Sequence, residues 1–171
     1  MKKSLYILGN LEDQDLIWMS SVGIGRDVQQ GELLIKAGEP VSDLFFVIRG
    51  NLAIVSEVKG EIASIGVGDV IGEMSFVEKR SPSVSVQAKS HSRVLAVPRD
   101  ALLAEFVHNQ GFAARFYLAL AVFLSDRLRS MTGGVMAGEV ENELDEGILD
   151  NLHVAGDRML RLIDLLDGAA S

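Results

Sequence analysis

The sequence predicts an α+β fold in which a jelly roll of short strands is followed by helices. Between residues 32 and 97, short runs rich in β-branched and aromatic residues alternate with glycine-containing turns, which indicates strands. Many short strands at close spacing are typical of a jelly roll or barrel. From residue 100 onward, apolar residues recur at helical spacing instead. The 171 residues suffice for one domain with its own core and an appendage.

Before the roll, a short amphipathic helix is predicted over residues 8–19, and we expect Trp18 to pin it to the roll. The predicted strands are residues 32–37, 43–48, 52–57, 62–65, 83–88 and 94–97. The turns between them are marked by Gly38, Gly50, Lys59-Gly60 and Gly68. After the last strand, Asp100 is a suitable N-cap for a helix over residues 101–107. Gly111 is expected to break the chain before a long helix, Phe112–Ser130.

The long helix carries two apolar stripes. The first consists of Phe112, Phe116, Ala119, Leu120 and Phe123. The second consists of Ala113, Tyr117, Ala121, Leu124 and Leu128. A surface helix buries one stripe of roughly 100° or more, so two stripes require two partners. We expect the first stripe to pack on the roll and the second to form a homodimer through Phe112–Ser130. The alternative is that the C-terminal segment folds back and covers the second stripe within one chain.

Beyond the long helix, residues 132–138 are predicted to form a Gly-rich joint, and residues 139–168 an acidic amphipathic helical tail that ends at Gly168. Its apolar stripe is Leu144, Ile148, Leu152, Ala155, Met159, Ile163 and Leu166. Residues 139–171 hold nine acids and two arginines, which is −7 of the total net charge of −8. This charge repels phosphate-rich partners, so we expect a protein partner for residues 139–168 and no direct DNA binding.

The composition disfavours several other function classes. Because the chain has no cysteine, it has no thiolate metal site or cysteine nucleophile, which fits a cytoplasmic location. No stretch approaches the roughly 20 uninterrupted apolar residues that a membrane span needs. His91, His108 and His153 are too scattered to suggest a metal cluster. The carboxylates have neither a histidine partner nor a nucleophile motif, so we expect neither an enzyme nor a cofactor.

The segment with the clearest chemistry is Val70-Ile-Gly-Glu-Met-Ser-Phe76, which is followed by Ser81-Pro-Ser-Val-Ser-Val-Gln-Ala88. Gly72 lets the backbone come close to a ligand, and the amides of Met74 and Ser75 enter a short helical turn. Such amides form a nest for a phosphate, and the Glu73 carboxylate beside them suits a sugar hydroxyl.

These two motifs resemble the phosphate-binding cassette of cyclic nucleotide-binding domains, and residues 1–131 resemble that domain. The usual cassette reads Gly-Glu-x-Ala/Ser-x, a spacer, then Pro-Arg-Ser/Ala-Ala-Thr/Ser-Val-x-Ala. The matching positions are Gly72, Glu73, Ser75, Ser83, Ser85, Val86 and Ala88. The turn glycines of Gly31–Gly38, Leu44–Gly50 and Gly68-Asp69 follow the intervals of the family's β-roll. Where the family has the arginine that pairs with the cyclic phosphate, this chain has Pro82.

The resemblance implies a regulatory domain that binds cAMP or cGMP. Glu73 would accept a hydrogen bond from the ribose 2′-hydroxyl, and the amides of Met74 and Ser75 would face the phosphate, with Ser83 and Ser85 as further donors. Because proline cannot replace a guanidinium, we expect weak or altered binding unless Arg80 reaches in from the spacer. The alternative is a protein-interaction or dimerisation module whose degenerate pocket holds no ligand.

Overall fold

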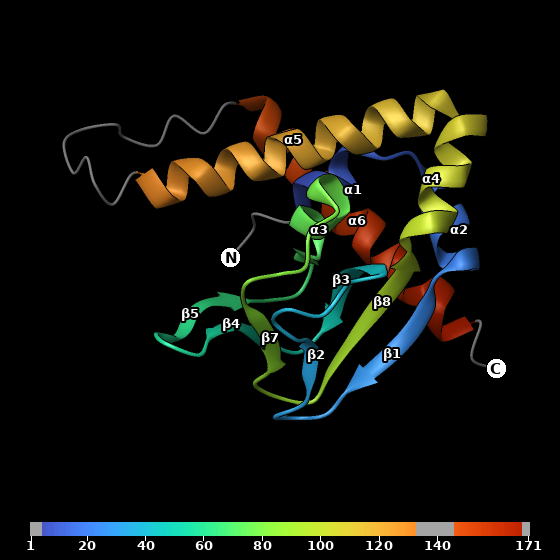
Figure 1. Ribbon diagram of the computed structural model, residues 1–171. Helices are drawn as coiled ribbons and strands as arrows, with labels where there is room; N and C mark the ends of the chain where they lie inside the picture. Colours follow the sequence, from blue (N-terminus) through green and yellow to red (C-terminus); the bar gives the residue numbers. More distant parts are fainter. Residues whose placement is uncertain (1–4, 133–145, 169–171) are drawn as a thin grey trace.

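The computed structural model of the chain describes residues 5–132 and 146–168 (Figure 1). Two short helices, α1 (Leu5–Asn10) and α2 (Asp13–Val22), come first. The strands are β1 (Ile24–Val28), β2 (Leu33–Ile35), β3 (Asp43–Arg49), β4 (Leu52–Ser56), β5 (Gly60–Ile65), β6 (Val70–Ile71), β7 (Ser85–Ala88) and β8 (Ser92–Pro98). Helix α3 (Glu73–Glu78) lies between β6 and β7. After β8 come α4 (Arg99–His108), α5 (Gln110–Thr132) and α6 (Glu146–Gly168).

The strands form two four-stranded antiparallel sheets, in the orders β1-β8-β3-β6 and β2-β7-β4-β5. Apolar side chains from both sheets make the core between them, while helices cover the outer face of the first sheet. Strand β3 is therefore buried on both faces: Phe45 and Val47 face the core between the sheets, and Leu44, Phe46 and Ile48 face the helices. The predicted α+β jelly roll with flanking helices is confirmed.

The predicted turn glycines are also confirmed, since Gly38, Gly50, Gly60 and Gly68 all have positive φ. At Gly50 the close approach of another segment of the chain is a second reason why the residue must be glycine. A Cβ there would lie 2.3 Å from Ser92 Oγ and 2.7 Å from the carbonyl oxygen of His91. Only glycine combines this φ of 90° with such close packing.

The N-terminal region differs from its prediction, because two helices replace the single one. Glu12 begins α2 with a capping box: its side chain accepts from the backbone of Asp15, whose carboxylate accepts from the Glu12 amide at 2.8 Å. Trp18 packs against the cluster that joins the helices to the outer face of the first sheet, and its ring lies edge-on to Phe112 of α5 at 5.6 Å between centroids. The tryptophan therefore joins two helices.

Further differences concern element ends and short strands. Strands β1 and β6 were not predicted; β6 has only two residues, and β1 lies largely exposed at the edge of its sheet. Helix α4 begins at Arg99 after Pro98, so Asp100 lies in its first turn and is not the N-cap. The break before α5 lies at Asn109, whose side chain accepts a hydrogen bond from the Phe112 amide at 3.0 Å, so Gly111 is helical.

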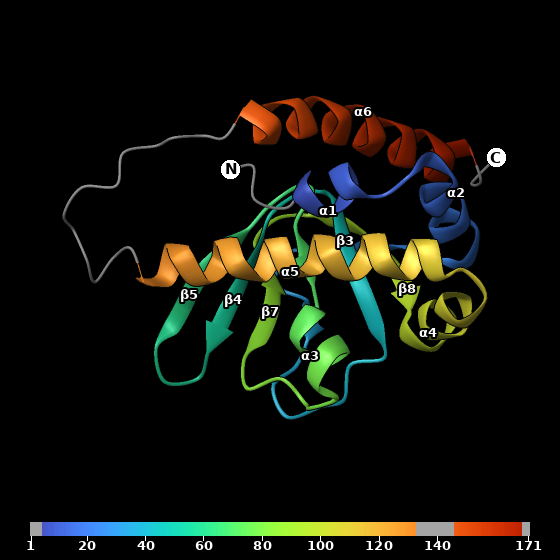
Figure 2. The ribbon, with the colours of Figure 1, turned by 90° about the horizontal axis from the view of Figure 1, so that it is seen from above.

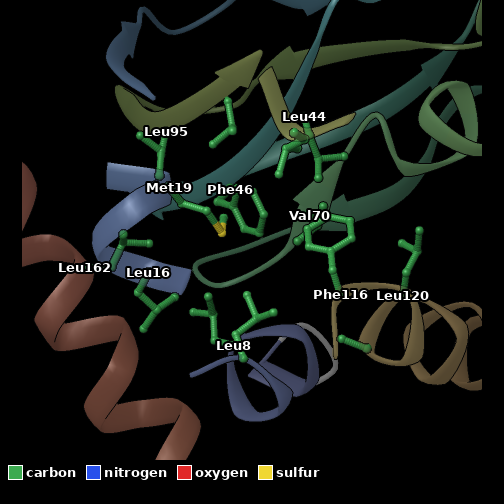
Figure 3. Close-up of a cluster of buried hydrophobic side chains, with 14 of the residues drawn as sticks. Leu8, Leu16, Met19, Leu44, Phe46, Val70, Leu95, Phe116, Leu120 and Leu162 are labelled. Atoms are coloured by element: carbon green, nitrogen blue, oxygen red, sulfur yellow. The ribbon is translucent and has the colours of Figure 1, made fainter. Parts of the chain in front are cut away.

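The first predicted stripe of α5 is buried throughout, as expected. It packs in the cluster that Figure 3 shows, where Phe116 of α5 lies beside Val70; Leu120, Leu8 and Phe46 belong to the same cluster. The second stripe is divided: Ala113 and Leu124 are partly buried against the core, whereas Tyr117 and the neighbouring Leu118 and Val122 are exposed. The exposed part of α5 thus has no cover within the described chain.

Helix α6 packs against α1 and α2, so that α1 lies between α5 and α6 (Figure 2). Its buried residues include the predicted Ala155, Met159 and Leu166, together with Leu162, which the predicted stripe omitted. Leu144 and the joint at residues 133–138 lie outside the described residues. The C-terminal segment does fold back within one chain, but it covers α1 and α2 and leaves the exposed part of α5 open. None of the described helices has the length and apolar character needed to span a membrane.

Two arginines hold α6 in place. Arg158 donates to the carbonyl oxygens of Leu8 and Gly9, at 3.1 and 2.7 Å. These carbonyls belong to the last turn of α1, where the helix offers no internal donors and its dipole favours a cation. Arg161 pairs with Asp13 at the start of α2. The two basic residues of the acidic tail thus both fix it to the N-terminal helices.

Candidate ligand-binding site

A cavity of about 520 Å³ lies between strands β4 and β5, helix α3 and the segment that leads into β7. Helix α5 closes one side of it through Phe123. The apolar lining comprises Ile35, Ile54, Ile62, Ala63, Ile65, Val70, Ile71, Met74, Pro82, Val84, Val86 and Phe123. Its remaining described residues are Ser64, Asp69, Gly72, Glu73 and Ser75. The volume is in the range of pockets that take small molecules.

Gly72 shapes the corner of this cavity. It is the N-cap of α3, with a φ of 92°, and a Cβ there would come to 3.0 Å from the carbonyl oxygen of Asp43 on β3. Its own carbonyl accepts the Phe76 amide at 2.9 Å, which closes the first turn of α3. The amides of Glu73, Met74 and Ser75 precede that bond and have no acceptor inside the helix. The predicted glycine corner is present and faces the cavity.

Two carboxylates line the cavity, and both are held in place. Glu73 is only 4% exposed and occupies the first turn of α3, where the helix dipole favours a negative charge. Asp69 accepts a hydrogen bond from the Gly66 amide at 2.7 Å, within the turn that leads into β6. The described lining residues include no lysine, arginine or histidine. The charged residues among the described lining are therefore both acidic.

Pro82 stands at the position where the resemblance implied an arginine that pairs with the cyclic phosphate. It lines the cavity, and its carbonyl accepts the Gly38 amide at 2.8 Å, which ties this segment to the turn between β2 and β3. Arg80, two residues upstream, is exposed and is not among the lining residues. The structure thus places a rigid apolar ring at this wall of the cavity.

The two serines of the second motif lie away from the cavity. Pro82, Val84 and Val86 line it, whereas Ser83 and Ser85 are not among its lining residues. Ser83 is exposed, and the Ser85 hydroxyl accepts the Ala37 amide at 3.0 Å, beyond the end of β2. Of the predicted site residues, the structure brings together Gly72, Glu73, Met74, Ser75 and Pro82; Arg80, Ser83 and Ser85 are outside the lining.

Sequence reasoning missed Phe123 and Asp69 as lining residues. Phe123 was predicted as part of a buried stripe, and nothing local in the sequence indicates that this stripe passes beside the cavity. Asp69 follows Gly68, so the sequence indicated a turn residue at this position and not a residue of the cavity wall. A further contact links the corner to the same helix: the Phe76 ring of α3 lies 5.7 Å from Phe116 and 6.4 Å from Tyr117 of α5, between centroids.

A sequence model of the cyclic nucleotide-binding domain matches residues 25–109. The potassium voltage-gated channel protein eag of Drosophila melanogaster is 28% identical over 118 residues, which cover 68% of this chain and 10% of the channel protein. The chain spans less than a quarter of the length of the curated relatives it matches.

Solved structures show the same fold. A cyclic nucleotide-binding domain from Methylobacillus flagellatus superposes with a TM-score of 0.69 at 21% identity, over 81% of this chain and 85% of that one. The catabolite activator protein of Thermus thermophilus superposes with a TM-score of 0.63 at 18% identity, over 96% of this chain and 88% of that one.

Proposed function

Residues 25–109 place this chain in the cyclic nucleotide-binding domain family, and from that premise we propose that it is a regulatory domain that senses a small molecule in the cavity beside Glu73. The observation that carries the proposal is the cavity itself. The corner from Gly72 to Ser75 opens onto a hollow of about 520 Å³ that the protein's own side chains leave unfilled. The proposed role is regulatory, without a catalytic step, and the proposed location is the cytoplasm.

For cyclic nucleotides themselves, the proposal is weak or altered binding. Glu73 would accept from the ribose 2′-hydroxyl, and the amides of Met74 and Ser75 would face the phosphate. Pro82 offers no donor to that phosphate, and a hydrogen bond to a charged group contributes about 1.5–3 kcal/mol. Its absence corresponds to roughly a 10- to 100-fold lower affinity, since about 1.4 kcal/mol is a factor of ten.

The signal would reach α5 by two routes. Phe123 lines the cavity directly, and Phe76 of α3 contacts Phe116 and Tyr117. A ligand that fits one arrangement of α3 and α5 better than another shifts the population toward it. The exposed part of α5, with Leu118 58% exposed, supports a homodimer through Phe112–Ser130 that would transmit the change.

The second candidate is an interaction module without a ligand. The exposed apolar residues of α5 favour it, and so do Val154 and Leu160, which are exposed on α6 beside the acids Asp157 and Asp164. In this reading, the cavity is a vestige and the exposed helices bind a protein partner.

Titration calorimetry with cAMP, cGMP and a cyclic dinucleotide tests the proposal. Pro82→Arg should strengthen cyclic nucleotide binding about tenfold or more, because it restores a charge-assisted contact. Ser83→Arg is the matched control, since it adds the same charge at a residue outside the lining and should change little. Glu73→Ala should abolish nucleotide binding.

Two outcomes would count against this proposal for nucleotides. Equal affinity of the wild type and Pro82→Arg would show that another group already meets the phosphate. If neither the wild type nor Pro82→Arg gives heat with any nucleotide at millimolar concentration, the ligand-free module is favoured.

A further inference from the structure

We propose that Met74 is an oxidation site, and that its conversion to the sulfoxide by a peroxide weakens the binding of apolar ligands in the cavity. This inference rests on the proposed sensing function and adds a means of regulating the same site. It follows from the position of Met74, from the burial of the other described methionines and from the lack of cysteine.

Met74 lies where the cavity opens to solvent. It lines the cavity from α3, although it is 55% exposed. Ile62 of β5 also lines the cavity and is about half exposed. Residues that belong both to the lining and to the surface mark the mouth of a cavity. A small reagent that approaches the mouth from water therefore meets the Met74 side chain.

Methionine carries all of the sulfur in this chain, because the sequence contains no cysteine. Among the methionines whose side chains the structure describes, Met19 and Met159 are buried, and both belong to the cluster between the helices and the first sheet. Susceptibility to oxidation increases with exposure. Within the described part of the chain, Met74 is therefore the methionine that an oxidant in solution reaches first.

The reaction transfers one oxygen atom to the Met74 sulfur. A sulfur lone pair attacks one oxygen of hydrogen peroxide, the O–O bond breaks, and the other oxygen leaves as water after a proton shift. The sulfur loses two electrons and becomes a sulfoxide, while the peroxide is reduced. A methionine sulfoxide reductase reverses the change with two electrons from a dithiol, which becomes a disulfide, and the sulfoxide oxygen leaves as water.

A sulfoxide at this wall changes the character of the cavity. The lining is largely aliphatic and aromatic, and Ile54, Ile65 and Phe123 belong to it. Oxidation turns the flexible apolar side chain of methionine into a polar one. An apolar ligand that displaces water from this polar group gives it no hydrogen bond in return, which is unfavourable. We therefore expect the oxidised cavity to bind apolar ligands more weakly.

N-phenylnaphthylamine, an uncharged dye that fluoresces in apolar sites, tests the inference on the full chain. The chain is treated with hydrogen peroxide, oxidised methionines are identified by peptide mass spectrometry, and the dye is titrated before and after treatment. We expect Met74 to be oxidised at least about tenfold faster than Met19 and Met159, and the dye to bind at least about fivefold more weakly afterwards. Methionine sulfoxide reductase with dithiothreitol should restore the affinity.

Three variants separate Met74 from the other methionines. Met74→Leu cannot be oxidised at this position, so its affinity for the dye should be the same before and after treatment. Met74→Gln introduces a polar side chain of similar length and should bind the dye more weakly than Met74→Leu without any oxidant. Met131→Leu with Met136→Leu should keep the full response to peroxide. Circular dichroism before and after treatment checks that the fold is retained.

Two cavity variants, Ile62→Trp and Val84→Phe, locate the dye, and both should weaken its binding to the untreated chain. A loss of affinity that requires Met74 and that the reductase reverses then supports the inference. If Met74 is oxidised no faster than the buried methionines, if its sulfoxide leaves the affinity unchanged, or if Met74→Leu responds as the wild type does, the inference is overturned and the sensing function stands. If neither cavity variant changes dye binding to the untreated chain, the sensing function falls and the inference falls with it.

Discussion

Replacing Arg115 with methionine should destabilise the fold by about 3 kcal/mol, because it leaves a buried carboxylate without its counter-ion. Arg115 of α5 donates through Nε to Asp15 Oδ2 at 2.8 Å and through Nη2 to Asp15 Oδ1 at 2.9 Å. The Asp15 side chain is only 1% exposed, whereas Arg115 is 27% exposed. This pair joins α2 to the helix that carries Phe123.

The magnitude follows from what remains after the substitution. Removing one partner of a buried ion pair typically costs about 3–5 kcal/mol. Asp15 keeps the hydrogen bond from the Glu12 amide, and the partly exposed arginine leaves room for water, so the lower end applies. For a chain of this size, about 3 kcal/mol corresponds to a fall in Tm of roughly 6–12 °C.

The pH dependence has a defined sign. The hydrogen bond to Asp15 raises the pKa of Arg115 above its usual value. A raised pKa contributes stability that is fully present below the unfolded value and is lost only as the pH rises through the folded value. Since arginine stays protonated throughout the range in which proteins remain folded, the loss caused by Arg115→Met should be the same at about pH 6 and pH 9.

Urea unfolding followed by circular dichroism measures the effect, and Arg26→Met is the matched control. Arg26 pairs with Glu32 at 2.9 Å on the surface, and such exposed pairs contribute about 0–1 kcal/mol. In a double-mutant cycle, adding Asp15→Asn to Arg115→Met should recover part of the loss, because it removes the uncompensated charge. A cost of Arg115→Met below about 1 kcal/mol, or strictly additive single changes, would refute the reasoning.

The remaining predictions concern the helices and the glycine corner. Leu162→Ala should cost about 2–5 kcal/mol in the same unfolding assay, because Leu162 is fully buried where α6 meets the core; an unchanged stability would mean that α6 does not pack there. Gly72→Ala should lower Tm and weaken ligand binding, since φ is 92° and the new Cβ would meet the Asp43 carbonyl at 3.0 Å; equal Tm would contradict that geometry. Leu118→Asp should convert the proposed dimer to a monomer in sedimentation velocity, with Tm preserved, and a dimer that persists would place the interface elsewhere.

Local features could be predicted because neighbouring residues decide them. Runs of branched and aromatic residues indicated most strands, and positive φ followed from the turn glycines. The first stripe of α5 has the helical period, which predicts one buried face. The run of β3 is apolar at successive positions, which predicts a strand that is buried on both faces. Where short-range signals are few, prediction failed: β6 has two residues, and the capping box at Glu12 was read as the interior of one helix.

The site could be predicted only in part for the same reason. Gly72 and Glu73 form a local corner, so their place in the site is readable from the sequence. The side of the chain on which Ser83 and Ser85 fall depends on where the extended segment begins relative to the cavity, and one residue of register reverses it. The packing of β7 between β2 and β4 therefore decides that Val84 lines the cavity and that the two serines do not.

From the sequence alone came the β-roll with its helices, the glycine corner and the replacement of an expected arginine by Pro82. Tertiary structure alone decided that Phe123 closes the cavity, that Asp15 pairs with Arg115 a hundred residues away, and that α6 covers α1 and α2 instead of α5. The division has one physical cause. Steric preferences and periodicity act between near neighbours, whereas contacts between distant segments depend on how whole elements pack, and many pairings satisfy the same local pattern.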